Sequence, residues 1–130
     1  MSTNYVVITE KYAERHYIKK FQKKYKSFWD KTWQGIIEEL KRLDALLETG
    51  IADEIVCIND ISICKTEFRI AGTKYSRKKS GNRCIIAAHK KIREIKILLV
   101  YHKDDIGGNN ETATWKKIIR ENYIDYTFCK

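Results

Sequence analysis

Several side chains in the second half of the chain have the chemistry to act on a phosphodiester. They are cations, a phenol and an imidazole at or near the ends of strand-like segments, namely Lys65, Arg69, Arg83, Tyr101, His102 and Lys103. Guanidinium groups bind phosphate bidentately and stabilise the extra charge of a transition state. A histidine or a lysine can transfer protons. The set therefore suits phosphodiester chemistry without a metal ion.

A structural interpretation competes with the catalytic one at these positions. The two arginines could pair with Glu67 or Glu94 across strands, which is common in sheets. Tyr101 could be an ordinary half-buried aromatic residue, and His102 a solvent-facing residue at the end of a strand. The sequence alone leaves both interpretations open.

The net charge of the chain is concentrated in one block. The chain has 130 residues, with 26 Lys and Arg against 17 Asp and Glu and a net charge of +9. Between Lys65 and Lys96, eleven basic residues face only Glu67 and Glu94, so this block holds the whole excess. Such a block is typical of a surface that binds phosphates. The alternative is a solvated basic hairpin without a partner.

Other classes of protein are disfavoured. No apolar run approaches the ~18 residues of a membrane helix, and the N-terminus lacks the pattern of a secretory signal. The four cysteines form no CxxC pair and the three histidines have no zinc-finger spacing, so we expect no metal or other cofactor. Glycine-rich nucleotide-binding motifs, HExxH and GxSxG are missing. We expect one domain over residues 1–130, in the reducing cytoplasm.

The first half of the chain predicts a strand followed by two helices. Residues 5–8 have the β-branched content of a strand. Apolar residues recur at helical spacing over residues 11–25 and again, in one long stripe, over residues 29–47. Ser27 with Asp30 resembles a capping box, and Gly50 supplies the stop after the second helix.

The second half predicts strands, because the hydrophobic period changes from 3.6 to 2 after residue 54. Strands are expected at 61–70, 83–89 and 94–101, the last one apolar on both faces as a central strand is. If the sheet is antiparallel and ordered along the chain, the end of the third of these strands lies beside the start of the second. Arg83 then lies near Tyr101, His102 and Lys103, at one rim of the sheet.

A final helix is expected after Asn110, which can cap it. Its apolar face holds Trp115, Ile118, Ile119 and Tyr123. The order β-α-α-β-β-β-α predicts an α+β fold, in which an N-terminal strand and a helical hairpin pack on a mainly antiparallel sheet with a C-terminal helix. We expect the helices to lie on one face of that sheet.

Three pieces of the second half resemble the RelE/ParE superfamily of bacterial type II toxins, and most of all its RelE-like HigB branch. They are KTEFRIA at 65–71, SGNRCII at 80–86 and ILLVYHKD at 97–104, with a basic turn between the first two. The resemblance covers residues 61–106 and agrees in element order with the N-terminal helical hairpin. It implies a RelE-like fold and cleavage of mRNA, usually in the ribosomal A site.

The resemblance also implies roles for individual residues and partners. Basic residues at positions 65, 69, 83 and 103 fall where such toxins keep catalytic or RNA-binding side chains, whereas Glu67 stands where some relatives have a cation. We expect Arg83 to stabilise the scissile phosphate and His102 and Lys103 to transfer protons or compensate charge, with Arg69 and Tyr101 beside them. A cognate antitoxin is expected to cover the basic face. The RNA backbone, mRNA or ribosomal, would be held by Lys65, Lys74, Arg77, Lys78, Lys79, Lys90 and Lys91.

Two other functions remain open from the sequence. One is a ParE-like toxin that inhibits DNA gyrase by binding it, since a fold does not define a function. The other is a nucleic-acid-binding module without catalysis, which predicts binding with a steep salt dependence and no cleavage.

Overall fold

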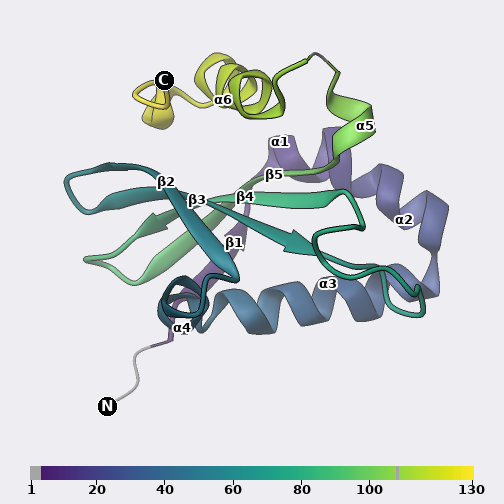
Figure 1. Cartoon of the computed structure of the whole chain (residues 1–130). Helices are drawn as coiled ribbons and strands as arrows, with labels where there is room; N and C mark the ends of the chain where they lie inside the picture. Colours follow the sequence, from purple (N-terminus) through teal and green to yellow (C-terminus); the bar gives the residue numbers. More distant parts are fainter. Residues whose placement is uncertain (1–3, 108) are drawn as a thin grey trace.

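A five-stranded sheet forms the centre of the computed structural model, which describes residues 4–107 and 109–130 (Figure 1). The strands lie in the order β1 (Val6–Thr9), β5 (Glu94–His102), β4 (Asn82–His89), β3 (Ile61–Phe68) and β2 (Ala52–Ile58). β1 is parallel to β5, and every other pair of neighbours is antiparallel. The predicted α+β fold with a mainly antiparallel sheet is confirmed.

The N-terminal helices differ in detail from the prediction. They are α1 (Lys11–Ala13), a π-helical segment η1 (Glu14–Ile18), α2 (Lys19–Tyr25), α3 (Ser27–Leu40) and α4 (Leu43–Glu48). The predicted capping box is wrong, because Ser27 is already helical and the boundary falls at Lys26, with φ 51°. The predicted single long helix is divided into α3 and α4 where Arg42 leaves the helical conformation.

The C-terminal part contains α5 (Lys103–Ile106), α6 (Glu111–Asn122) and a 3₁₀ turn η2 (Ile124–Tyr126). The predicted cap of α6 is confirmed, since Asn110 Oδ1 accepts a hydrogen bond of 3.0 Å from the Ala113 amide. Among the described residues, no helix has the length and apolar character needed to cross a membrane.

Two separate cores lie on the two faces of the sheet. On one face Trp29, Ile36 and Leu40 of α3 pack against residues such as Cys84 and Ile86 of β4. On the other face, the α6 residues pack against the alternate sheet residues, in a cluster that includes Ile85, Leu99, Trp115 and Ile119. Figure 1 shows α3 and α4 on one side of the sheet and α6 on the other. The expectation that all helices share one face is therefore wrong.

Strand β2 was not predicted, and its pattern explains why. Its side chains show no alternation of buried and exposed positions, and its pairing with β3 shifts between Glu54 and Val56. A strand at the edge of a sheet with a bulge presents no clean period of two. A turn at Asn59, with φ 54°, returns the chain from β2 into β3.

We predict that Gly35→Ala stabilises the protein. Gly35 lies inside α3, and a Cβ added there meets no atom within 4 Å. Glycine inside a helix costs about 1 kcal/mol relative to alanine, so the free energy of unfolding should rise by about 0.5–1 kcal/mol in urea denaturation. A lower free energy of unfolding would contradict the exposed, unstrained position given to Gly35.

Candidate functional site

Arg83 and Tyr101 face α6 and belong to a polar row across the sheet. In register, Glu67 of β3 lies opposite Arg83 of β4, which lies opposite Tyr101 of β5. Glu111, at the start of α6, completes the row: its Oε2 is 3.2 Å from Arg83 Nε and accepts a 2.7 Å hydrogen bond from the Tyr101 hydroxyl. Arg83 Nη1 lies 3.2 Å from Glu67 Oε2.

These contacts leave Arg83 and Tyr101 without a free surface for substrate. Only 9% of Arg83 and 1% of Tyr101 is exposed, and two carboxylates balance the guanidinium charge. Burial, followed by the hydrogen bond to Glu111, raises the pKa of Tyr101 well above its ordinary value. The predicted adjacency of Arg83 and Tyr101 is confirmed, but the expectation that Arg83 offers free charge to a phosphate is wrong. The pairing of Arg83 with Glu67, the alternative interpretation, is the arrangement found.

His102 lies on the opposite side of the sheet from Tyr101, because neighbouring residues of a strand point to opposite faces. It pairs in register with Asn82. Its Nδ1 accepts a 3.1 Å hydrogen bond from the Asp104 amide and lies 3.6 Å from Asp104 Oδ2. In the neutral ring, this hydrogen bond assigns the proton to Nε2. Nε2 faces Gly81, where an added Cβ would lie 2.6 Å away. An imidazole can transfer protons, which makes His102 a candidate for that role.

An open pocket of about 280 Å³ lies beside His102, and we call it the His102 pocket. Its walls come from four parts of the chain. They include Lys24 and Tyr25 of α2, Tyr75 of the segment between β3 and β4, Asn82 and His102 on the sheet, and Asp104 and Asp105 of α5. A smaller hollow of about 50 Å³ shares five of these residues and adds Lys20 and Phe21 of α2. An imidazole is thus placed in a pocket whose walls also carry one lysine, two phenol rings and two carboxylates.

The basic character of α2 escaped the sequence analysis. Six basic residues and no acidic residue occur from residue 15 to residue 29: Arg15, Lys19, Lys20, Lys23, Lys24 and Lys26. Their charge was cancelled in the overall count by the acidic residues of 38–60. A charge count in a window of about 15 residues reveals this second block. It matters because α2 contributes Lys20 and Lys24 to the walls beside His102.

The segment 69–81 between β3 and β4, here called the β3–β4 connection, lies at the same end of the molecule as α2 and α5 (Figure 1). Lys74, Lys78 and Lys79 are exposed on it, and 63% of Tyr75 is exposed among them. Lys103 is also exposed, directly after His102. The structure therefore brings these predicted residues to one end of the sheet.

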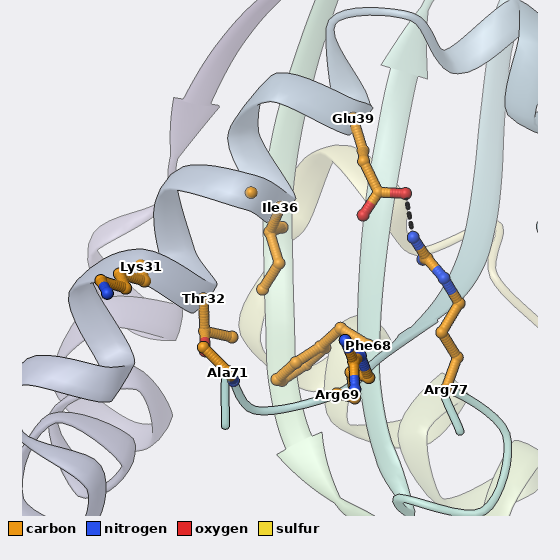
Figure 2. A pocket seen from close by; sticks show the side chains of 9 residues that line it. Lys31, Thr32, Ile36, Glu39, Phe68, Arg69, Ala71 and Arg77 are labelled. Atoms are coloured by element: carbon orange, nitrogen blue, oxygen red, sulfur yellow. Dashed lines mark hydrogen bonds and ion pairs between the residues drawn. The ribbon is translucent and has the colours of Figure 1, made fainter. Parts of the chain in front are cut away.

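Arg77 and Arg69 line a different hollow, of about 280 Å³, between α3 and the β3–β4 connection (Figure 2). Arg77 forms an ion pair with Glu39 of α3, and its Nη1 donates a 3.1 Å hydrogen bond to the Glu67 carbonyl. Arg69 Nη1 donates to the Thr73 carbonyl at 3.1 Å. Arg77 thus tethers the connection to α3, and its predicted role in RNA binding stays a prediction. Arg69 belongs to this hollow and not to the walls given for the His102 pocket.

The remaining predicted cations lie elsewhere. Lys90 and Lys91 follow β4, whereas Asn82 begins it, and eight residues of strand separate the two ends by roughly 25 Å. Lys90 also forms a 3.0 Å ion pair with Glu54. Lys65 pairs in register with Ile85, on the face that α6 covers. The expectation that these three lysines share one RNA surface with the β3–β4 connection is wrong.

Comparison with known proteins defines the fold. No family model matches the sequence, and no curated protein matches it. A chain in the crystal structure of the archaeal RelE–RelB complex from Pyrococcus horikoshii OT3 superposes with a TM-score of 0.52 at 16% identity, over 76% of this chain and 94% of that chain. The chain therefore has a RelE-like fold, as the sequence predicted.

We predict that Gly81→Ala displaces the His102 ring. A Cβ at Gly81 would lie 2.6 Å from His102 Nε2, and Gly81 has φ +79°. Gly50→Ala is the matched control, because Gly50 has φ +78° and open space around it. Both variants should lose about 1 kcal/mol of stability from backbone strain, but only Gly81→Ala should shift the imidazole resonances in NMR spectra. Unchanged His102 resonances in that variant would contradict the contact.

We predict that Arg83→Ala is strongly destabilising. It leaves the carboxylates of Glu67 and Glu111 beside each other without the cation between them. Breaking a buried ion pair in this way should lower the free energy of unfolding by about 2–4 kcal/mol. Lys91→Ala, at an exposed turn, should change it by less than about 0.5 kcal/mol. Equal stabilities in urea denaturation would refute the role given to Arg83.

Proposed function

We propose that the chain is the toxin of a bacterial type II toxin–antitoxin system, of the HigB-like branch, and that it cleaves mRNA on the ribosome. The observation that supports this most is the His102 pocket: an imidazole on a RelE-like fold, with lysines of α2, the β3–β4 connection and α5 around one end of the sheet. The site of action would be the cytoplasm, where ribosomes are.

The reaction that we assign to the pocket is intramolecular phosphoryl transfer, in which the phosphate moves to the 2′-hydroxyl of the adjacent ribose. The 2′-hydroxyl oxygen attacks the adjacent phosphorus, the bond from phosphorus to the 5′ oxygen breaks, and a cyclic phosphate and a 5′-hydroxyl end result. His102 would accept the 2′ proton or supply the proton to the leaving oxygen. Lys24 and Lys103 would balance the charge of the transition state.

The distribution of histidines favours dependence on the ribosome. His102 lines the pocket, whereas His16 is exposed on η1 and His89 is hydrogen-bonded to Tyr126 at 2.7 Å. A single imidazole cannot act as base and acid at the same moment. A ribosome could hold the mRNA with the 2′ oxygen in line with the bond from phosphorus to the 5′ oxygen. This orientation would compensate for the absence of a second catalytic group.

The exposed cations would hold the RNA backbone. Lys74, Lys78 and Lys79 are exposed on the β3–β4 connection, which supplies Tyr75 to the walls of the His102 pocket, and further lysines lie on α2, which supplies Lys24 and Tyr25. Tyr75, exposed among the lysines, provides a flat ring on which a base can stack. Binding of this kind weakens steeply as salt is raised.

An antitoxin is the proposed protein partner. The similar archaeal chain was crystallised in a RelE–RelB complex. A partner that covers the basic end of this chain needs acidic side chains, since complementary charge steers association. The hollow in Figure 2, whose lining includes Lys31, Arg69, Ile36 and Phe68, offers such a partner both charge and apolar contact.

We predict that His102→Ala abolishes cleavage. General acid–base catalysis contributes roughly 10²–10⁴-fold to a rate, so cleavage of mRNA in a purified translation reaction, mapped by primer extension, should fall at least 100-fold. Lys91→Ala, at the opposite end of the sheet, should cleave like the parent chain. Omitting ribosomes should stop cleavage by the parent.

Two results would refute the proposal. One is cleavage by His102→Ala at the rate of the parent chain. The other is an intact mRNA pool together with inhibited DNA supercoiling, which would indicate a gyrase inhibitor instead.

A further inference from the structure

The β3–β4 connection is joined to α3 at two points. Near its start, the Ala71 amide donates a 2.8 Å hydrogen bond to Thr32 Oγ1. Near its end, Arg77 forms its ion pair with Glu39, and Figure 2 shows these two side chains pointing toward each other. The same guanidinium donates to the Glu67 carbonyl of β3 at 3.1 Å. One planar group therefore holds α3, β3 and the connection together.

An open hollow separates α3 from the connection between these two points. It measures about 280 Å³, and its lining includes both members of each joined pair, with Ile36 of α3 between them (Figure 2). A segment that borders open space makes few packing contacts. The position of the connection over α3 therefore depends on the polar groups at the two joined points.

The segment held in this way forms one wall of the His102 pocket. Four residues of the connection line that pocket, namely Ile70, Thr73, Tyr75 and Ser80. The side chains of Lys74 and Tyr75 have no hydrogen bond or ion pair with any residue that the structure describes. Since they are not held by contacts of their own, a displacement at Arg77 would move Tyr75 relative to the imidazole.

Direct contact with RNA is the competing role for Arg77. Its side chain is 40% exposed, but both terminal nitrogens are already engaged, one by the Glu39 carboxylate and the other by the Glu67 carbonyl. A carboxylate beside the guanidinium also balances the charge that a phosphate would need. The geometry therefore favours a role in holding the connection.

We propose that Arg77 and Glu39 are positioning residues of the His102 pocket. Their ion pair holds the β3–β4 connection against α3 and so places Tyr75 and the neighbouring lysines where RNA is bound. Apparent affinity for RNA falls with the fraction of molecules in which the pair is open. This inference rests on the proposed function in one respect, that the ligand of these lysines is RNA. It adds that an acidic residue of α3 supports the binding of a polyanion.

The two roles give opposite signs for Glu39→Ala. Removing a carboxylate from a chain that binds a polyanion ordinarily tightens binding, whereas removing a positioning partner weakens it. Fluorescence anisotropy of the full chain with a labelled oligouridylate measures the dissociation constant. Glu39→Ala should raise that constant about threefold to fivefold, as expected for a partly exposed ion pair. Glu38→Ala is the matched control: it removes the same charge from the next residue, whose partner is Lys41 at 3.0 Å, and should not weaken binding.

Substitutions of Arg77 separate its charge from its shape. Arg77→Lys keeps the charge, but an ammonium group lacks the planar fork that reaches Glu39 and the Glu67 carbonyl together. It should weaken binding about as much as Glu39→Ala does. Adding Glu39→Ala to Arg77→Ala should cause no further loss, because both substitutions remove the same pair.

Hydrogen exchange locates the effect. In Glu39→Ala the amides of residues 72–79 should exchange faster than in the parent chain, while those of α3 and β4 should keep their rates. The melting temperature should change by less than about 4 °C, because the pair lies at the surface. A larger fall, with faster exchange throughout the chain, would give the pair a general role in folding and overturn the inference.

The remaining outcomes are distinct. Binding by Glu39→Ala that equals or exceeds that of the parent chain, unchanged exchange in the connection, or full binding by Arg77→Lys would each overturn the inference. Weakened RNA binding by Glu39→Ala in a chain that leaves ribosome-bound mRNA intact would support the inference and refute the nuclease. A parent chain that binds no oligouridylate would refute the RNA surface of the proposed function, and the exchange rates would then decide whether the pair positions the connection.

Discussion

The ion pairs of Arg83 connect three parts of the molecule. Through Glu67 the guanidinium links β4 to β3, and through Glu111 it holds the first turn of α6 on the sheet, where the Tyr101 hydroxyl reinforces the same carboxylate. A cation with this little exposure must be paired, because an unpaired charge in such a place is costly. The pairing keeps α6 over the apolar residues of the sheet face that it covers. Arg83 and Tyr101 on this face therefore stabilise the fold and have no free surface for a ligand.

The location of the candidate chemistry follows from this arrangement. With α3 and α4 on one face of the sheet and α6 on the other, the ends of the strands are the places where sheet residues can meet a ligand. At one end α2, the β3–β4 connection and α5 meet around His102 (Figure 1). At the other end Lys90 is held by Glu54. The basic block of the sequence is thus split between two ends of one sheet.

Patterns of period two and of helical period predicted most of the elements, because they report which residues face a core. The alternation in residues 61–70 and the apolar run before Tyr101 were sufficient to place Arg83 opposite Tyr101. They could not show which face α6 covers, since β4 is apolar on both faces and offers two equivalent surfaces. Nor could they show that Glu111 reaches Arg83 from 28 residues away. The lysines of α2 were missed because the charges were summed over long stretches of the chain, in which the acidic residues of 38–60 cancel them.

The π-helical segment η1 has a consequence for the direction of α2. Buried positions step by five residues from Ala13 to Ile18, and the Lys19 amide bonds back to the Glu14 carbonyl, five residues earlier. One additional residue in a turn rotates all that follows by about 100° around the helix axis. Without that phase shift, Phe21 would leave the core, and Lys20 and Lys24 would leave the walls of the hollows beside His102. A single widened turn near the start of the chain therefore sets the azimuth of a basic helix relative to a strand end some eighty residues downstream.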